Sequence, residues 1–187
     1  YNGKIFKLDE HLNRLRHSAQ ALAFQHIPSN DALSAELSKT LLANNMVDGV
    51  HIRLTLTRGK KITSGMDPRL NQDGNTLIVL AEFKSSVYDT SGLTLASSSI
   101  RRFTPDTLDP KIHHCNLIQS IMAKIEATAA GADDALMLDQ RGFVAETNAT
   151  HIFFVKDEYV CTPRAVACPE GVTRQTVIDL CHEHDID

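Results

Sequence analysis

Two helical patterns open the chain. The first helix is expected to begin at Asp9, a good N-cap residue, and to end before Pro28. Its apolar positions recur at the 3.6-residue period of a helix: Leu12, Leu15, Ala19, Leu22 and Ala23. A second helix is expected from about Asn30, because leucines follow at four-residue spacing: Leu33, Leu37 and Leu41.

Two strand patterns come next, separated by a loop over residues 58–75. Residues 50–57 alternate between apolar and polar side chains, which predicts a strand with one face toward water. Residues 76–83 form a mostly apolar run, which predicts a central strand buried on both faces.

A polar segment over residues 84–92 ends in Gly92 and predicts a boundary between two domains. We place the N-terminal, smaller α/β domain at residues 1–86, a linker at 87–91 and the larger C-terminal domain at 92–187. The chain begins at Tyr1 without Met and stops at Asp187 just after a helical pattern, so both domains are expected to be cut at their outer ends.

The second half predicts a strand over residues 93–97, an irregular crossing segment over 101–110 and then a strong helix. The apolar stripe of that helix consists of Leu117, Ile118, Ile121, Met122 and Ile125. Gly131 is expected to end it as a left-handed C-cap. Two hairpins (135–139 with 143–146, and 152–155 with 159–161) and a last helix from about Thr173 complete a mixed α and β fold.

Composition limits the possible functions. The chain has 187 residues, 42% hydrophobic and 22% charged, which is typical of a globular protein rather than a disordered one. A net charge of −4 indicates neither a nucleic acid nor an anionic membrane as partner, and no apolar run approaches the ~20 residues of a membrane span. Four cysteines without a CxxC pair favour a reducing, cytoplasmic location.

Four short motifs could carry chemistry, and their order along the chain matters more than any one of them. They are Arg14 on the first helix (residues 10–15), Lys111 before the strong helix (109–116), Glu146 at a strand end (142–147) and the helix start Gly171-Val172-Thr173-Arg174. Taken alone, Lys111 and Glu146 would more often be solvated surface residues, and Thr173 would be an N-cap.

With residues 132–139 and 161–163, these motifs resemble the class IV aminotransferases. That family comprises pyridoxal phosphate enzymes such as branched-chain and D-amino acid aminotransferases and aminodeoxychorismate lyase. The resemblance covers nearly the whole chain. It implies part of the two-domain, D-amino acid aminotransferase-like fold (fold-type IV), with pyridoxal 5′-phosphate between the domains and a homodimer that completes each active site.

The resemblance also assigns roles to residues. Lys111 would form the Schiff base with pyridoxal phosphate and then shuttle a proton between substrate and cofactor, and burial would help it by lowering its pKa. Glu146 would pair with the pyridine nitrogen. Arg14, Thr173 and the N–H groups of Val172 and Thr173 would bind the phosphate.

The chain departs from the family at two positions near Glu146. Thr147 stands where the family commonly has Gly, and His151 stands where it commonly has Asn. A histidine can still donate one hydrogen bond there.

The function expected from these residues is transfer of the amino group of a small amino acid, first of all a branched-chain one, to a 2-oxo acid. Aminodeoxychorismate lyase and D-amino acid aminotransferase are the alternatives within the fold, and a truncated, non-catalytic module is the alternative from another class. No metal site is expected: Cys181-His182-Glu183-His184 is interpreted as a solvated helix end, and Arg101 and Arg102 as exposed arginines.

Overall fold

The structure is a computed structural model and describes residues 1–85 and 91–187. It divides into two compact units, Tyr1–Val87 and Tyr88–Asp187. Residues 87–90 of the expected linker lie outside the described residues, so the division into 1–86, 87–91 and 92–187 stays a prediction. Within the described residues, no helix is both long and apolar enough to cross a membrane.

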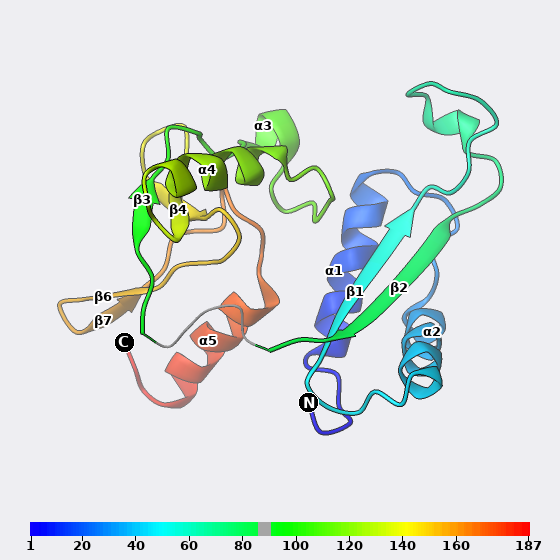
Figure 1. Cartoon of the computed structure of the whole chain (residues 1–187), viewed down its shortest axis with the longest axis horizontal. Helices are drawn as coiled ribbons and strands as arrows, with labels where there is room; N and C mark the ends of the chain where they lie inside the picture. Colours follow the sequence, from blue (N-terminus) through cyan, green and yellow to red (C-terminus); the bar gives the residue numbers. More distant parts are fainter. Residues whose placement is uncertain (86–90) are drawn as a thin grey trace. The chain divides into compact units, whose positions relative to one another are not determined.

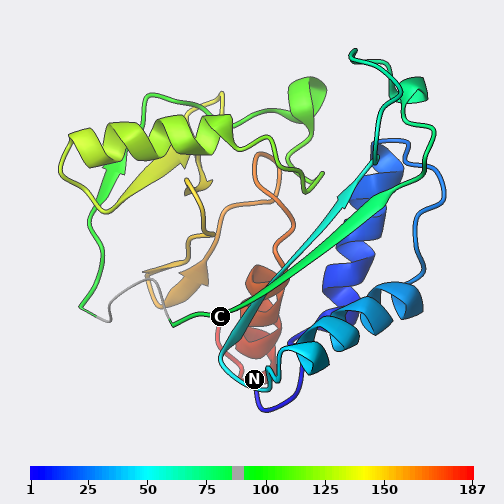
Figure 2. The same ribbon diagram turned by 45° about the vertical axis from the view of Figure 1, so that its right-hand side comes forward.

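The first unit consists of two helices packed on a two-stranded antiparallel sheet (Figures 1 and 2). Leu12, Leu33 and Leu37 are its fully buried leucines, and they pack against the inward-facing side chains of both strands. The elements are α1 (Leu8–Ala21), α2 (Asn30–Ala43), β1 (Val50–Thr57), the short 3₁₀ helix η1 (Pro68–Leu70) and β2 (Thr76–Phe83).

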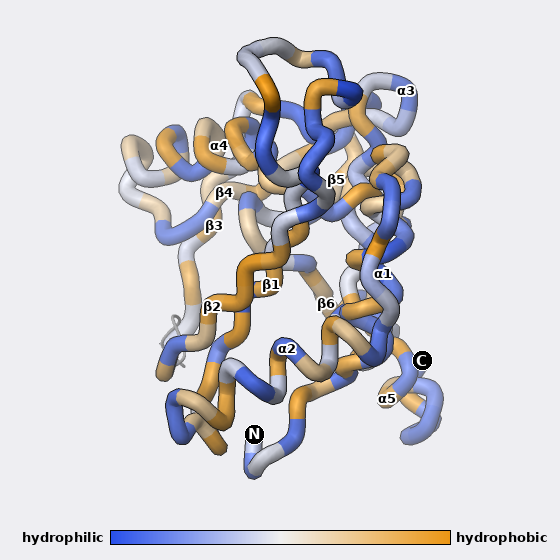
Figure 3. The backbone as a smooth tube through the Cα atoms, turned by 90° about the vertical axis from the view of Figure 1, so that its right-hand side faces the viewer, coloured by the Kyte–Doolittle hydropathy of each residue, from blue (hydrophilic) through white to orange (hydrophobic). Residues whose placement is uncertain are grey.

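Two expectations for this unit were wrong. The N-cap of helix α1 is Lys7, two residues before the expected Asp9; Lys7 has a left-handed conformation and forms no side-chain cap. Strand β2 pairs only with β1 among the described residues, and its burial alternates; Ile78 and Leu80 are about half exposed. It is therefore a half-buried strand, although Figure 3 shows a hydrophobic run along it.

The second unit contains a three-stranded sheet of order β3-β4-β5, with β3 parallel and β5 antiparallel to β4. A separate hairpin is formed by β6 and β7. The elements are β3 (Leu95–Ser97), α3 (Pro105–Leu108), α4 (Ile118–Ala129), β4 (Asp134–Leu138), β5 (Val144–Thr147), β6 (Phe154–Lys156), β7 (Tyr159–Cys161) and α5 (Val172–Glu183). The hairpins and last helix are confirmed, whereas the segment expected to be irregular contains α3.

Helix α4 packs on the sheet through its small side chains. Ala123 and Ala127 are buried against Ala135 and Met137 of β4, and Gly131 follows the helix with φ +75°, as expected of a C-cap. The apolar stripe predicted for this helix lies on the outside instead, because alanines let the helix approach the sheet most closely. Its exposed members are Leu117, Ile118, Ile121, Met122 and Ile125.

A register shift in β5 lies next to Glu146. Met137 pairs with Glu146, but Leu138 already pairs with Val144, so Ala145 is an extra residue in the bulged strand. Such bulges re-aim neighbouring side chains. Ala145, Glu146 and Thr147 are all buried, which places a carboxylate inside the second unit.

Candidate active site

The centre of the candidate site is the buried carboxylate of Glu146. Its side chain is 7% exposed and forms an ion pair with Arg102, whose Nη2 lies 2.5 Å from Oε1. Burial raises the pKa of Glu146 to about 7, although the Arg102 charge and hydrogen bond act in the opposite direction. Glu146 is therefore a carboxylate whose charge is stabilised only in part by its protein neighbours.

Arg102 was wrongly expected to be an exposed arginine, since its side chain is only 12% exposed. Its backbone N–H bonds to Leu138 at the end of β4, and its guanidinium donates to the Ala167 carbonyl and to Ser120 of α4. These contacts come from three separate segments of the chain. Arg102 therefore holds Glu146 by a guanidinium that is itself fixed from several sides.

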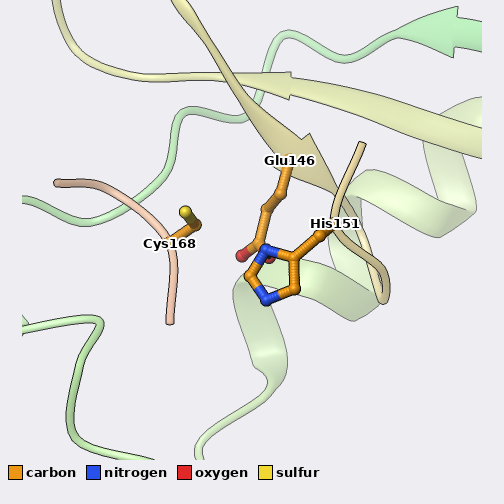
Figure 4. A group of neighbouring side chains, drawn as sticks. All are labelled: Glu146, His151 and Cys168. Atoms are coloured by element: carbon orange, nitrogen blue, oxygen red, sulfur yellow. The ribbon is translucent and has the colours of Figure 1, made fainter. Parts of the chain in front are cut away.

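His151 and Cys168 lie to either side of the Glu146 side chain (Figure 4). His151 Nδ1 is 3.7 Å from Glu146 Oε2, and one ligand atom from each of the three residues lies within 4.8 Å of the others. Cys168 is buried, and burial with the Glu146 charge raises the pKa of its thiol to about 11. Its thiol is therefore protonated at neutral pH.

Lys111 lies beside the loop that leads into α5. Its Nζ is 3.4 Å from Oε1 of Glu170, and Glu170 directly precedes Gly171. The Lys111 side chain is 48% exposed, so the burial expected for it is not found in this chain. Because both partners of this ion pair are exposed, the pair is weak and the amine is readily released for another partner.

The N-terminus of α5 fits a phosphate. Helix α5 begins at Val172, one residue before the expected start, and Gly171 is its N-cap without a side-chain hydrogen bond. The first N–H groups of a helix point outward and favour an anion. Val172 and Thr173 stand in this first turn, and their role as phosphate ligands stays a prediction.

Arg14 lies in the other unit. It is half-buried on α1, with its guanidinium 3.5 Å from Nδ1 of His11, and burial lowers its pKa. A partly desolvated guanidinium gains from a bound anion. The role of Arg14 as a phosphate ligand stays a prediction.

Lys111, Glu146 and the start of α5 are thus parts of one unit, connected through the segment 167–171. Arg102 and Glu170 belong to this arrangement but were not identified as site residues from the sequence. Arg102 could have been suspected from its place close before Lys111, but nothing in the sequence distinguishes it from the adjacent Arg101. No sequence signal indicates Cys168 either.

Comparison with solved structures identifies proteins with a similar fold. A solved structure of the branched-chain amino acid aminotransferase from Thermobaculum terrenum, in its pyridoxal phosphate form, superimposes with a TM-score of 0.84 at 28% identity, covering 95% of this chain and 58% of that one. A putative 4-amino-4-deoxychorismate lyase from Legionella pneumophila gives 0.88 at 25% identity, covering 100% and 67%. The fold is therefore part of the fold-type IV aminotransferase fold.

The family follows from the sequence comparison. The model of "Amino-transferase class IV" matches residues 1–187, and the chain belongs to that family. Branched-chain-amino-acid aminotransferase-like protein 2 of Arabidopsis thaliana is 55% identical over 181 residues, which are 96% of this chain and 32% of that protein. The chain thus spans about a third of this curated relative and 58% of the Thermobaculum terrenum structure.

Proposed function

We propose that the chain carries the pyridoxal phosphate site of an aminotransferase that moves the amino group of a small, branched-chain amino acid to a 2-oxo acid. The observation that carries this proposal is the buried Glu146, in the same unit as the Lys111 amine and the open N-terminus of α5. The family and the relatives named above support it.

The residues present fit the cofactor. A buried carboxylate with a raised pKa gains from a positive partner, which a protonated pyridine nitrogen provides. The α5 N-terminus offers N–H groups to a phosphate, and Lys111 offers an amine held by a weak ion pair. When bound, pyridoxal phosphate supplies an aldehyde and an electron-accepting ring.

The chain's own residues then have separate tasks. Lys111 would hold the aldehyde end of the cofactor through its amine, and the same amine, when free, would take the proton from the substrate α-carbon. Glu146 would face the ring nitrogen and favour its protonated form, while Arg102 fixes the position of the Glu146 carboxylate. Val172, Thr173 and Arg14 would bind the phosphate.

The assembly and location are proposed on separate grounds. A homodimer rests on the family resemblance, and a cytoplasmic location rests on four cysteines that are all free in the structure. A sizing measurement by light scattering would show whether the chain forms the dimer.

Amino transfer tests the function directly. The chain with pyridoxal phosphate, L-leucine and 2-oxoglutarate should form glutamate, and Lys111→Ala should lower the rate by about 10³-fold, because the amine that binds the aldehyde and moves the proton is lost. Lys156→Ala is the control, since Lys156 is an exposed residue of β6.

Other substrates separate the alternatives. Release of pyruvate from 4-amino-4-deoxychorismate would favour the lyase, and activity with D-alanine alone would favour the D-amino acid aminotransferase. A chain that binds pyridoxal phosphate with none of these activities would contradict the proposed amino transfer. A chain that cannot bind pyridoxal phosphate would support the non-catalytic module instead.

A further inference from the structure

The group formed by Glu146, His151 and Cys168 has donor atoms typical of a metal site, but its surroundings are unsuited to one. The Arg102 guanidinium already contacts one oxygen of Glu146, and the charge of Arg174 acts on Cys168. A divalent cation would have to enter between two arginines and displace the proton of a thiol that burial keeps protonated. The position of His151 is better explained by the two groups on either edge of its ring, the Glu146 carboxylate and the backbone of Gly171.

A tight turn fixes His151 relative to Glu146. The Thr147 hydroxyl accepts hydrogen bonds from the N–H groups of Ala149 and Thr150, at 3.2 and 2.8 Å, and the Thr147 N–H donates to the Thr150 carbonyl at 2.9 Å. The backbone between Glu146 and His151 therefore has little freedom. The ring edge with Nδ1 consequently faces Oε2 of Glu146.

The opposite edge of the His151 ring lies against Gly171. A Cβ atom at position 171 would overlap Nε2 and Cδ2 of His151. The backbone of Gly171 has φ −74° and ψ 130°, which any residue adopts, so its conformation does not require glycine. What requires glycine is the space that the ring occupies.

We propose that His151 is a positioning residue. Its ring packs against Gly171 and keeps the Glu146 carboxylate at a fixed distance from the first turn of α5. The proposal rests on the proposed function, in which these two elements bind opposite ends of one cofactor. A single side chain then sets the spacing between the partner of the ring nitrogen and the phosphate-binding turn. An asparagine at position 151 would keep an N–H group that can donate to a carboxylate.

Stability measurements test the contact without any cofactor. Gly171→Ala should lower the Tm by about 5 °C, because the new methyl group overlaps the ring. Combining it with His151→Ala should restore part of that loss, since the methyl group then has space. Gly171→Ala combined with His182→Ala is the control and should be additive, because His182 is exposed on the same helix. If the Tm losses of Gly171→Ala and His151→Ala simply add in the double variant, the proposed contact is wrong.

Binding of pyridoxine 5′-phosphate tests the positioning. This compound has the ring and phosphate but no aldehyde, so it cannot bond to Lys111. His151→Ala should raise its Kd about tenfold, as expected for loss of a contact to a charged group, while His151→Asn should stay within about threefold. The ¹⁵N signal of the labelled ring nitrogen should shift toward the unprotonated form in His151→Ala but not in His151→Asn.

The outcomes distinguish this proposal from the one on which it rests. If the unchanged chain binds the compound and His151→Ala binds it equally well with an unchanged ¹⁵N signal, the positioning role is wrong. An equal loss in His151→Asn and His151→Ala would also contradict it. If the unchanged chain fails to bind the compound, the proposed function fails, whatever the stability measurements show for His151 and Gly171.

Discussion

Glu146 shows at the scale of one residue how burial and charge compete. Its carboxylate lies inside the second unit, where burial favours the neutral form and Arg102 favours the charged form. Desolvation dominates, so the pKa of Glu146 is raised to about 7 from its ordinary value of 4.5. A bound cation next to Glu146 would favour its charged form and so lower its pKa.

The raised pKa makes stability depend on pH. Between pH 4.5 and 7 the folded chain binds more protons at Glu146 than the unfolded chain, so the free energy of unfolding falls as pH rises. We expect a loss of roughly 3 kcal/mol across this interval. Denaturant unfolding at several pH values should show it, and Glu146→Gln should remove it. An equal slope in both proteins would show that other groups, such as histidines, cause it.

Cys168 should be an unreactive thiol. It is 1% exposed, and burial raises the pKa of its thiol to about 11, so the thiolate is scarce at pH 7.5. Cys115 is exposed and serves as an internal control. Mass spectrometry after brief iodoacetamide treatment should find Cys115 modified and Cys168 unmodified. Equal modification of both in the folded chain would contradict the burial of Cys168.

The sequence identifies some site residues but not their contacts. Lys111 and Glu146 stand in recognisable motifs, and their roles stay predictions. The pairing of Arg102 with Glu146 joins residues 44 positions apart and depends on how β4, α4 and the segment near Ala167 meet. No local sequence pattern predicts these tertiary contacts. For this reason the sequence alone suggests that Arg102 is a surface residue.

At the scale of elements, α4 shows that a helix can pack through its smallest side chains. Ala123 and Ala127 are buried on β4 while larger apolar residues face outward. Ala127→Leu should lower the free energy of unfolding by about 1–3 kcal/mol, because the contact has no room for added methyl groups. Ile121→Ala should change it by less than about 0.5 kcal/mol. Denaturant unfolding of both variants measures this, and the reverse order would contradict the packing.

Periodicity predicts which segments are helices or strands better than it predicts their buried faces. The helices α2, α4 and α5 and the strands of both hairpins lie close to where the pattern places them. The apolar runs of β2 and α4 are harder to interpret, because an apolar side chain in the sequence does not show whether a neighbour covers it. In this chain, Leu80 of β2 and Ile125 of α4 are about half exposed.

At the scale of the whole molecule, the family assignment rests on motifs from both units. The motifs that indicate the fold-type IV fold are spread over both, and the comparisons confirm the family over residues 1–187. Of the residues with a proposed role, Arg14 belongs to the first unit, and Lys111, Glu146 and Thr173 belong to the second. The family resemblance, through order and spacing, predicts this set, and the roles of its members stay predictions. The exposure of Lys111 depends on tertiary contacts that order and spacing do not encode.

The central claim is that the amine of Lys111 binds pyridoxal phosphate covalently. The chain should be incubated with pyridoxal phosphate, reduced with borohydride, digested and mapped by mass spectrometry, with Lys111→Ala and Lys156→Ala treated in parallel. We predict a pyridoxyl group on Lys111 at near-stoichiometric yield in the unchanged chain and in Lys156→Ala, and none above background in Lys111→Ala. Modification spread over the exposed lysines, with Lys111 no more modified than Lys156, would contradict the account.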